Sequence, residues 1–80
     1  MAKSLHTQEY KHFRTLLTAA REKASLTQSE ISTRLDRPQS FVAKYEGGER
    51  RLDVIEFIQV CAALEIDPHS ILRDLQSKFA

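Results

Sequence analysis

Apolar residues recur every three or four positions along most of this chain, which is the period of an amphipathic α-helix. The first such stripe consists of Tyr10, Phe13, Leu16, Leu17, Ala20 and Ala24. No stretch alternates apolar and polar residues between turns, as a half-buried strand would, and the 80 residues include two glycines and two prolines. The pattern therefore predicts an all-α fold whose first helix covers about residues 8–24.

The ends of the other helices are marked by capping residues and helix breakers. Thr27 precedes Glu30 by three positions, the spacing of a capping box, and Asp53 has the same relation to Glu56. Pro38 disfavours helical backbone at the residue before it and suits the first turn of a new helix. The two adjacent glycines at 47 and 48 then end that helix. The helices predicted after the first cover about 27–35, 38–46, 53–64 and 68–79.

The last two predicted helices are unusually apolar. The helix over 53–64 carries apolar residues around most of its circumference, so we expect it to be the central buried element. The helix over 68–79 has a wider apolar stripe than a terminal helix of a small domain needs for its own core. We expect part of this stripe to contact a second subunit. The candidate interface residues are Ile71, Leu72, Leu75 and Phe79.

The two short helices predicted over 27–35 and 38–46 have the spacing of a helix-turn-helix. The surrounding sequence contains a Leu-Thr-Gln-x-Glu-Ile opening, Val42 at a core position, a Tyr-Glu-x-Gly ending and a later Ala-Ala-Leu-Glu-Ile-Asp-Pro segment. Through these motifs, roughly residues 13–75 closely resemble the phage-repressor-like helix-turn-helix family, of the Cro and repressor type, also called the xenobiotic-response-element family. The resemblance implies a compact five-helix bundle of the lambda-repressor-like type, with one domain over 1–80 and its core over about 8–79.

Three residues depart from the family pattern around the turn. Ser32 stands where the family usually has alanine, so its hydroxyl must bond back to a backbone carbonyl. Asp36 stands where the family usually has glycine and the backbone takes positive φ, which Asp tolerates better than most residues. Pro38 replaces the more usual Ser or Thr cap. We expect these departures to alter the fine geometry of the turn and to leave the motif in place.

The resemblance implies that the helix over 38–46 lies in the major groove and that its outward residues Gln39, Ser40 and Lys44 read bases. Their chemistry suits this role, because Gln can bond adenine at two atoms, Lys can donate to guanine, and Ser can donate or accept. The alternative is that they are ordinary polar residues on a solvated helix face.

Phosphate contacts are expected on both sides of that helix. Thr27 and Gln28 begin the preceding helix, where free N–H groups can receive a phosphate, and Gln28 matches the family's phosphate-contacting glutamine. Thr27 can cap the helix at the same time. Arg37, Arg50 and Arg51 flank the recognition helix and are expected to neutralise phosphate charge, the alternative for each being an ordinary surface charge.

Several residues are expected to hold the motif together. Arg21 and Glu46 resemble the family's structural ion pair between the first helix and the end of the recognition helix. Val42 and Tyr45 alternate with the base-reading positions and should face the core. Phe41 has two possible roles, contact with a thymine methyl group or packing against the first helix, and we favour packing.

Charge is unevenly distributed along the chain. Residues 1–52 carry ten basic and six acidic side chains, whereas residues 53–80 carry two and five. This distribution favours an anionic partner for the first part. We expect a cytoplasmic protein, because the sequence contains no membrane span and no secretory signal. The family resemblance implies that it is bacterial or phage-encoded. Cys61, which has no second cysteine to pair with, is expected to be a small core residue.

Catalytic chemistry has little support in the sequence. His6 and His12 do not share a helical face, His69 is remote from both, and no phosphate-binding loop follows the glycines. We therefore expect no catalytic residues, no metal, no cofactor and no small-molecule ligand. With no effector domain expected either, regulation would come from concentration or from a partner.

The sequence thus predicts sequence-specific binding of double-stranded DNA by a transcriptional regulator. In the family that it resembles, such proteins are most often repressors. Because one domain of this size offers few base contacts, we expect a homodimer on an inverted-repeat operator. The alternative is a small antitoxin or adaptor whose last two helices bind a protein partner, with DNA binding kept for autoregulation. Affinity for operator DNA, compared with affinity for a co-purifying protein, distinguishes the two.

Overall fold

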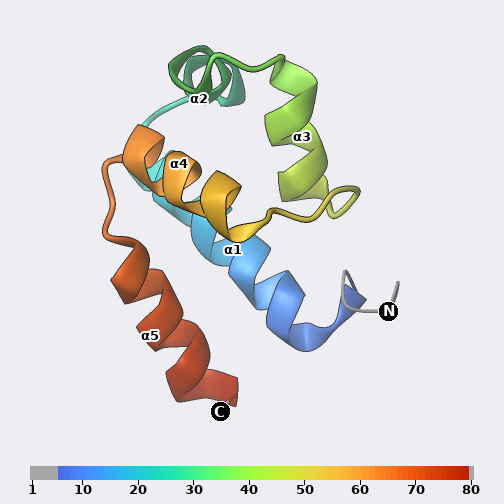
Figure 1. Ribbon diagram of the computed structural model, residues 1–80, viewed down its shortest axis with the longest axis vertical. Coiled ribbons are helices and arrows are strands. Elements are labelled where there is room, and N and C mark those ends of the chain that lie inside the picture. Colours follow the sequence, from blue (N-terminus) through green and yellow to red (C-terminus); the bar gives the residue numbers. More distant parts are fainter. Residues whose placement is uncertain (1–5, 80) are drawn as a thin grey trace.

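The structure is a computed structural model that describes residues 6–79, and this part of the chain forms five α-helices and no strand. The helices are α1 (Gln8–Lys23), α2 (Gln28–Leu35), α3 (Gln39–Gly47), α4 (Val54–Leu64) and α5 (Pro68–Phe79). Figure 1 shows α2 and α3 at one end of the molecule, α5 at the other end, and α1 running between them. The all-α prediction is confirmed. The domain predicted over 1–80 also includes residues 1–5 and 80, which lie outside the described residues.

The predicted helix boundaries agree with the structure to within one residue because local capping sets them. The Thr27 hydroxyl accepts from the N–H of Glu30 at 3.0 Å, and the Glu30 carboxylate accepts from the N–H of Thr27 at 2.8 Å. Asp53 and Glu56 form the same reciprocal pair before α4, at 2.7 and 3.0 Å. Each capping box satisfies backbone donors that a helix start leaves free.

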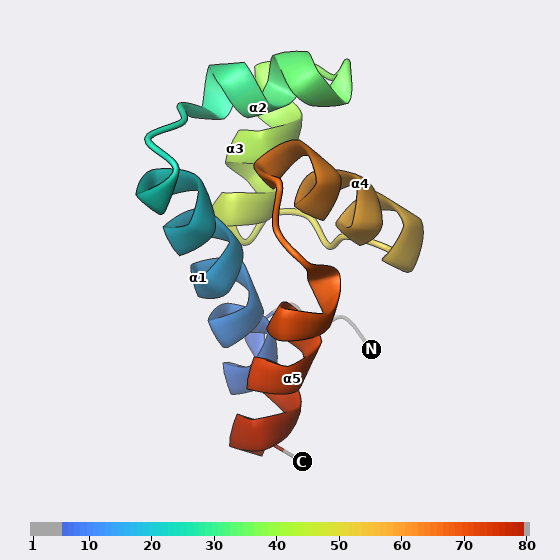
Figure 2. The ribbon, with the colours of Figure 1, turned by 90° about the vertical axis from the view of Figure 1, so that its left-hand side faces the viewer.

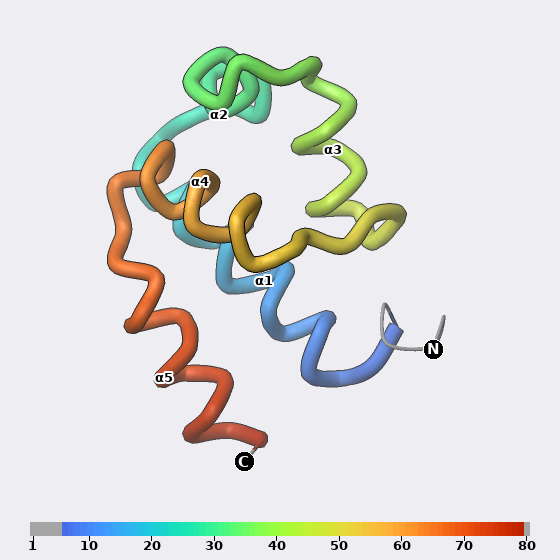
Figure 3. The backbone as a smooth tube through the Cα atoms, viewed as in Figure 1, coloured from blue at the N-terminus to red at the C-terminus, as the bar shows by residue number. Residues whose placement is uncertain are grey.

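The turn between α2 and α3 has the expected conformation. Asp36 adopts left-handed backbone, with φ 56° and ψ 45°, at the position where the family usually has glycine. The Ser32 hydroxyl donates back to the carbonyl of Gln28 at 2.8 Å, which satisfies it at the helix crossing. Pro38 is the N-cap of α3 and makes no side-chain capping bond. The tube in Figure 3 shows how this short turn redirects the chain from α2 into α3.

All five helices contribute to one hydrophobic core within residues 6–79. Val42 and Tyr45 on α3 are 0% and 2% exposed, which confirms that they face the core. Cys61 is fully buried as expected, and burial raises the pKa of its thiol to about 11. The buried hydrophobic residues are Leu17, Ile31, Phe41, Val42, Tyr45, Phe57, Val60, Cys61, Leu64 and Ile71.

The helix over 53–64, expected to be the central buried element, is buried on one face only. One face of α4 enters the core, but Val54, Ile55 and Ile58 on its other face are 71%, 64% and 49% exposed. The physical reason is the number of elements available. α4 packs mainly against α2 and α5, and no other helix within residues 6–79 covers its outer face.

The predicted interface residues on α5 divide between the core and the surface. Ile71 is 7% exposed and belongs to the chain's own core, so its assignment to a subunit interface is wrong. Leu75 is partly buried against that core, whereas Leu72 and Phe79 are 50% and 37% exposed. Figure 2 shows α5 lying along the first half of α1, and α5 also packs against α4.

Candidate nucleic-acid interface

The predicted base-reading residues lie on the outer side of α3. Gln39, Ser40 and Lys44 are exposed, whereas Val42 and Tyr45 on the same helix are buried. The helix is therefore held by its inner face and presents a polar outer face that includes its first turn. Pro38 is the N-cap of α3 and has no side-chain acceptor. It therefore forms no capping bond with the backbone N–H groups at the start of this helix.

The ion pair between Arg21 and Glu46 forms as predicted. Arg21 on α1 donates to both carboxylate oxygens of Glu46 on α3, at 2.8 and 3.0 Å. The two side chains are 14% and 6% exposed. Hydrogen bonding to Glu46 raises the pKa of Arg21. A third Arg21 bond, to the carbonyl of Leu26 at 2.8 Å, ties the same guanidinium to the segment between α1 and α2.

Gln28 joins this ion pair, which the sequence did not reveal. Its side-chain amide donates to Glu46 at 3.0 Å and so points into the protein. The side chain expected to reach a phosphate is thus engaged within the chain. Thr27 caps the helix as expected and is itself exposed, and the capping box occupies the N–H groups of Thr27 and Glu30. A phosphate at this position would be bound by the remaining helix N–H groups.

Phe41 packs inward, as favoured, although two arginines cover it. The ring is 8% exposed and lies edge-on to Tyr45, with centroids 5.5 Å apart. The guanidinium carbons of Arg37 and Arg50 lie 4.4 and 4.8 Å from the Phe41 ring centroid. Two cations that belong to different loops are therefore held against one ring at the edge of α3.

Glu56, which the sequence marked only as a helix cap, also binds these arginines. Arg50 donates to its two carboxylate oxygens at 2.9 and 2.7 Å, and Arg37 lies 3.6 Å from one of them. The bonds from Arg50, together with the N–H of Asp53, lower the pKa of Glu56 to about 2. They also raise the pKa of Arg50. Glu56 is therefore an ionised carboxylate at neutral pH.

A hollow of about 380 Å³ beside α3 brings predicted base-reading and phosphate-binding residues together. Ser40 and Lys44 line it from α3, Arg37 from the preceding turn and Arg50 from the following loop. Glu49 is an acidic residue in the same lining. Of the other candidates, Gln39, Thr27, Gln28 and Arg51 do not line this hollow.

The loop that carries Arg50 and Arg51 is fixed at both ends. At its start, Gly48 takes left-handed backbone with φ 81°, and the Arg14 guanidinium packs against the place where a Cβ would be. Arg14 also donates to the carbonyl of Glu46 at 3.2 Å. At its end, the N–H of Leu52 donates to the Tyr10 hydroxyl at 2.8 Å. The glycine pair signalled the turn, but no local pattern indicated the two α1 residues that hold it.

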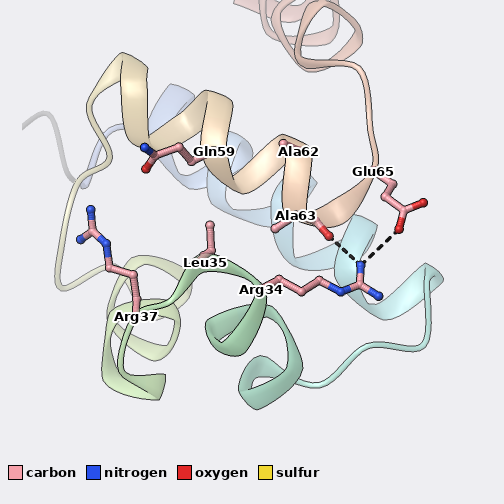
Figure 4. Close-up of a pocket in the computed structure, with 7 residues that line it drawn as sticks. All are labelled: Arg34, Leu35, Arg37, Gln59, Ala62, Ala63 and Glu65. Carbon is pink, nitrogen blue, oxygen red and sulfur yellow. Dashed lines mark hydrogen bonds and ion pairs between the residues drawn. The ribbon is translucent and has the colours of Figure 1, made fainter.

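A second hollow, of about 570 Å³, lies between α2 and α4. Figure 4 shows Arg34 reaching toward Ala63 and Glu65 at one end, while Arg37 lies at the other end and points away from them. Arg34 donates to the carbonyl of Ala63 at 2.7 Å and lies 3.4 Å from the Glu65 carboxylate. This arginine stabilises the end of α4, whereas Arg37 belongs with the residues around α3.

The apolar surface is concentrated away from α3. A groove of about 380 Å³ between α1, α4 and α5 is lined mostly by apolar side chains, including Phe13, Val54, Leu72 and Phe79. Within residues 6–79, no cluster of His, Cys, Asp and Glu could hold a metal ion. None of the helices in the same range is long and apolar enough to span a membrane.

Comparison with known proteins decides the family. A family model described as a helix-turn-helix domain matches residues 12–73. An XRE-family like protein from Pseudomonas syringae pv. tomato str. DC3000 has 45% sequence identity, with 98% of this chain and 95% of that chain covered and a TM-score of 0.89. The chain belongs to the XRE-type helix-turn-helix family. Members of this family are DNA-binding transcriptional regulators, and the resemblance noted in the sequence is confirmed.

More distant structures share the XRE-type fold. The restriction-modification controller protein C.AhdI from Aeromonas hydrophila has 22% identity and a TM-score of 0.74, with 81% of this chain and 98% of that chain covered. The clp gene regulator ClgR from C. glutamicum has 16% identity and a TM-score of 0.78, with 92% and 96% covered. No curated protein sequence matches the chain. These neighbours support the five-helix arrangement of the XRE-type domain.

Proposed function

We propose that this chain is a transcriptional repressor that binds an inverted-repeat operator as a homodimer in the cytoplasm. The observation that carries the proposal is the outer face of α3, where exposed polar side chains stand next to Arg37 and Arg50. Such a face combines groups that distinguish bases with cations that bind any phosphate backbone. A repressor needs no further chemistry, since occupying the operator is sufficient to block transcription.

Base reading is assigned to Gln39, Ser40 and Lys44. They lie on the exposed side of a helix whose opposite side is fixed in the core, so the fold fixes their positions on the surface of the domain. Gln39 can make a two-atom contact to adenine, and Lys44 can donate to guanine. Ser40 can donate or accept and so suits several bases.

Phosphate binding is assigned to the start of α2 and to the two loops that flank α3. Gln28 contributes through its backbone N–H, since its side chain bonds Glu46, and Thr27 contributes through its hydroxyl, since its N–H donates to Glu30. Arg37, Arg50 and Arg51 contribute positive charge on either side of the recognition helix. These contacts set the position of α3 in the groove and carry no base preference of their own.

Dimer formation is assigned to the exposed apolar surface of α4 and α5. Val54, Ile55 and Ile58 form an uncovered aliphatic face on α4, and Val54 lines one groove together with Leu72 and Phe79 of α5. A two-fold dimer buries the same patch on both subunits, which suits a continuous apolar face. Two recognition helices then contact two half-sites, which about doubles the contact free energy.

The same apolar surface supports the second candidate function. A small antitoxin or adaptor would place a protein partner on α4 and α5 and use α3 for its own operator. The exposed aliphatic residues fit this role as well as they fit a dimer. Sedimentation of the purified chain separates the two, because a homodimer forms without any other protein.

The experiment that tests base reading compares the sequence preferences of three variants. Gln39→Ala and Lys44→Ala should each lose about 1–3 kcal/mol of discrimination at particular base pairs. Arg51→Ala should weaken binding to all sequences alike and reduce the dependence on salt. Binding-site selection followed by titration measures both effects. Unchanged preferences in the Gln39 and Lys44 variants would contradict the assignment.

A further inference from the structure

We infer that Glu56 is a positioning residue for DNA binding, which holds Arg37 and Arg50 where both guanidinium groups meet phosphates beside α3. The inference rests on the proposed function. It adds to that function an acidic residue that would not itself bind DNA. Glu56 is acidic and lies on α4, so electrostatics alone would count it against DNA binding. Because Glu56 contacts Arg37 and Arg50, its effect is instead to favour DNA binding.

Glu56 contacts both arginines at once. Arg50 forms a two-atom contact with its carboxylate, at 2.9 and 2.7 Å, and Arg37 is 3.6 Å from the same group. The Glu56 side chain is 12% exposed, whereas those of Arg37 and Arg50 are 38% and 36% exposed. The carboxylate is therefore shielded behind the two cations that it orients.

Arg37 and Arg50 are fixed in direction as well as in place. Both guanidinium carbons lie within 5 Å of the Phe41 ring centroid, at 4.4 and 4.8 Å. Arg50 also donates to the carbonyl of Arg51 at 2.7 Å. A flexible arginine loses side-chain entropy when it binds a phosphate, and an arginine that is already held has lost it beforehand.

The Arg50 guanidinium keeps N–H donors for an acceptor that is not part of the protein. A guanidinium group has five N–H donors. The bonds that the structure describes for Arg50 use three of them, two to Glu56 and one to Arg51. The same guanidinium can therefore remain on Glu56 and still donate to a phosphate oxygen at the hollow that Ser40 and Lys44 also line.

The test is Glu56→Gln, which keeps the size of the side chain and removes its charge and one acceptor. Loss of a carboxylate by itself would tighten binding to a polyanion. A positioning role predicts the reverse, about five- to tenfold weaker binding to operator and unrelated DNA alike, with a salt dependence reduced by about one phosphate contact. The selected base sequence should not change.

Two control variants separate positioning from other effects. Glu65→Gln removes the same charge from the far end of α4, where the carboxylate pairs with Arg34, and should not weaken binding. Asp53→Ala removes the cap from α4 and leaves the Glu56 carboxylate on Arg50, so it should lower the melting temperature more than the DNA affinity. In an Arg50→Ala background, Glu56→Gln should have a clearly smaller effect on binding than in the native chain.

All variants are titrated with DNA below their measured melting temperatures. A loss of DNA affinity can therefore be distinguished from unfolding. If folded Glu56→Gln binds DNA as tightly as the native chain, or more tightly, the inference is overturned and the proposed function stands. If Asp53→Ala loses as much affinity and salt dependence as Glu56→Gln, capping explains the effect and the inference is again overturned. If the native chain binds no duplex DNA, the proposed function fails and the inference fails with it.

Discussion

Glu46 shows how one side chain can hold three helices together. It lies on α3 and accepts hydrogen bonds from Arg21 on α1 and from the Gln28 amide on α2. With 6% of the Glu46 side chain exposed, its charge depends on these donors for the solvation that water would otherwise provide. The orientation of α3 therefore depends on a charge that is satisfied within the chain.

Arg21→Ala should destabilise the domain strongly, because it leaves Glu46 buried without its main cation. We expect a loss of about 3 kcal/mol in the free energy of unfolding. Arg34→Ala is the matched control, since the Arg34 side chain is 42% exposed and its pair with Glu65 should contribute less than about 1 kcal/mol. Thermal unfolding of the two variants measures the difference. Equal melting temperatures for Arg21→Ala and the native chain would remove the ion pair from this account.

Gly48 is a second residue whose substitution should be costly. Its φ of 81° strains any side chain, and a Cβ at this position would collide with the Arg14 guanidinium. Gly48→Ala should therefore lower the melting temperature by roughly 5 °C or more. Gly47→Ala is the control, because Gly47 is helical and the nearest atom to its added Cβ is a Glu49 oxygen at 3.7 Å. The control should melt at the native temperature or slightly above it, and similar losses in both variants would contradict the argument.

At the level of elements, the start of α4 organises the loop before it. Glu56 is the third residue of α4 and completes its capping box. It also binds Arg50 of the preceding loop and lies close to Arg37 of the turn before α3. One helix end thus joins α4 to both flanks of the recognition helix. Because these contacts depend on the ionised Glu56 carboxylate, the stability of α4 should be sensitive to acid.

Protonation of Glu56 should destabilise the fold between about pH 4.5 and pH 2. Its pKa is lowered from 4.5 to about 2 in the folded chain, chiefly by the hydrogen bonds from Arg50. The stabilisation is therefore complete above pH 4.5 and is lost as the pH falls toward 2. Chemical unfolding across this range should show a shallower loss of stability in Glu56→Gln than in the native chain. Parallel curves for the two proteins would contradict the assignment.

Elements could be predicted from the sequence where local chemistry decides them. Thr27 with Glu30, and the left-handed Asp36, act on backbone within a few residues, so helix ends and the turn were predictable. The exposure of Ile55 on α4 was not predictable, because it depends on which helices are available to cover that face. The stacking of Arg37 and Arg50 on Phe41 joins two loops and leaves no local signal.

At the scale of the whole molecule, the polar and apolar surfaces lie on different elements. The outer face of α3 and its flanking arginines form one surface, and the aliphatic face of α4 with Leu72 and Phe79 of α5 forms the other. The separation allows a second subunit to bind without covering α3. The family and the recognition helix were predictable from sequence motifs. The apolar surface was not, because it depends on how the helices pack, which places Ile71 in the core and Ile55 on the surface.

Ile55→Glu should convert a dimer to a monomer. Ile55 is 64% exposed on the proposed interface, and a carboxylate there would have to be buried without a partner when two copies meet. Sedimentation at micromolar concentration measures the change. Ala19→Glu, at an exposed position of α1, is the control and should remain dimeric. A native chain that sediments as a monomer both with and without DNA would contradict the dimer proposal.

The most direct test of the account is selection of random duplex DNA by the purified chain, followed by titration at several salt concentrations. We predict a single inverted-repeat consensus, with half-sites about one helical turn apart, bound at least about 10³-fold more tightly than bulk DNA. Weak and unselective binding that falls steeply with salt would contradict sequence reading by α3.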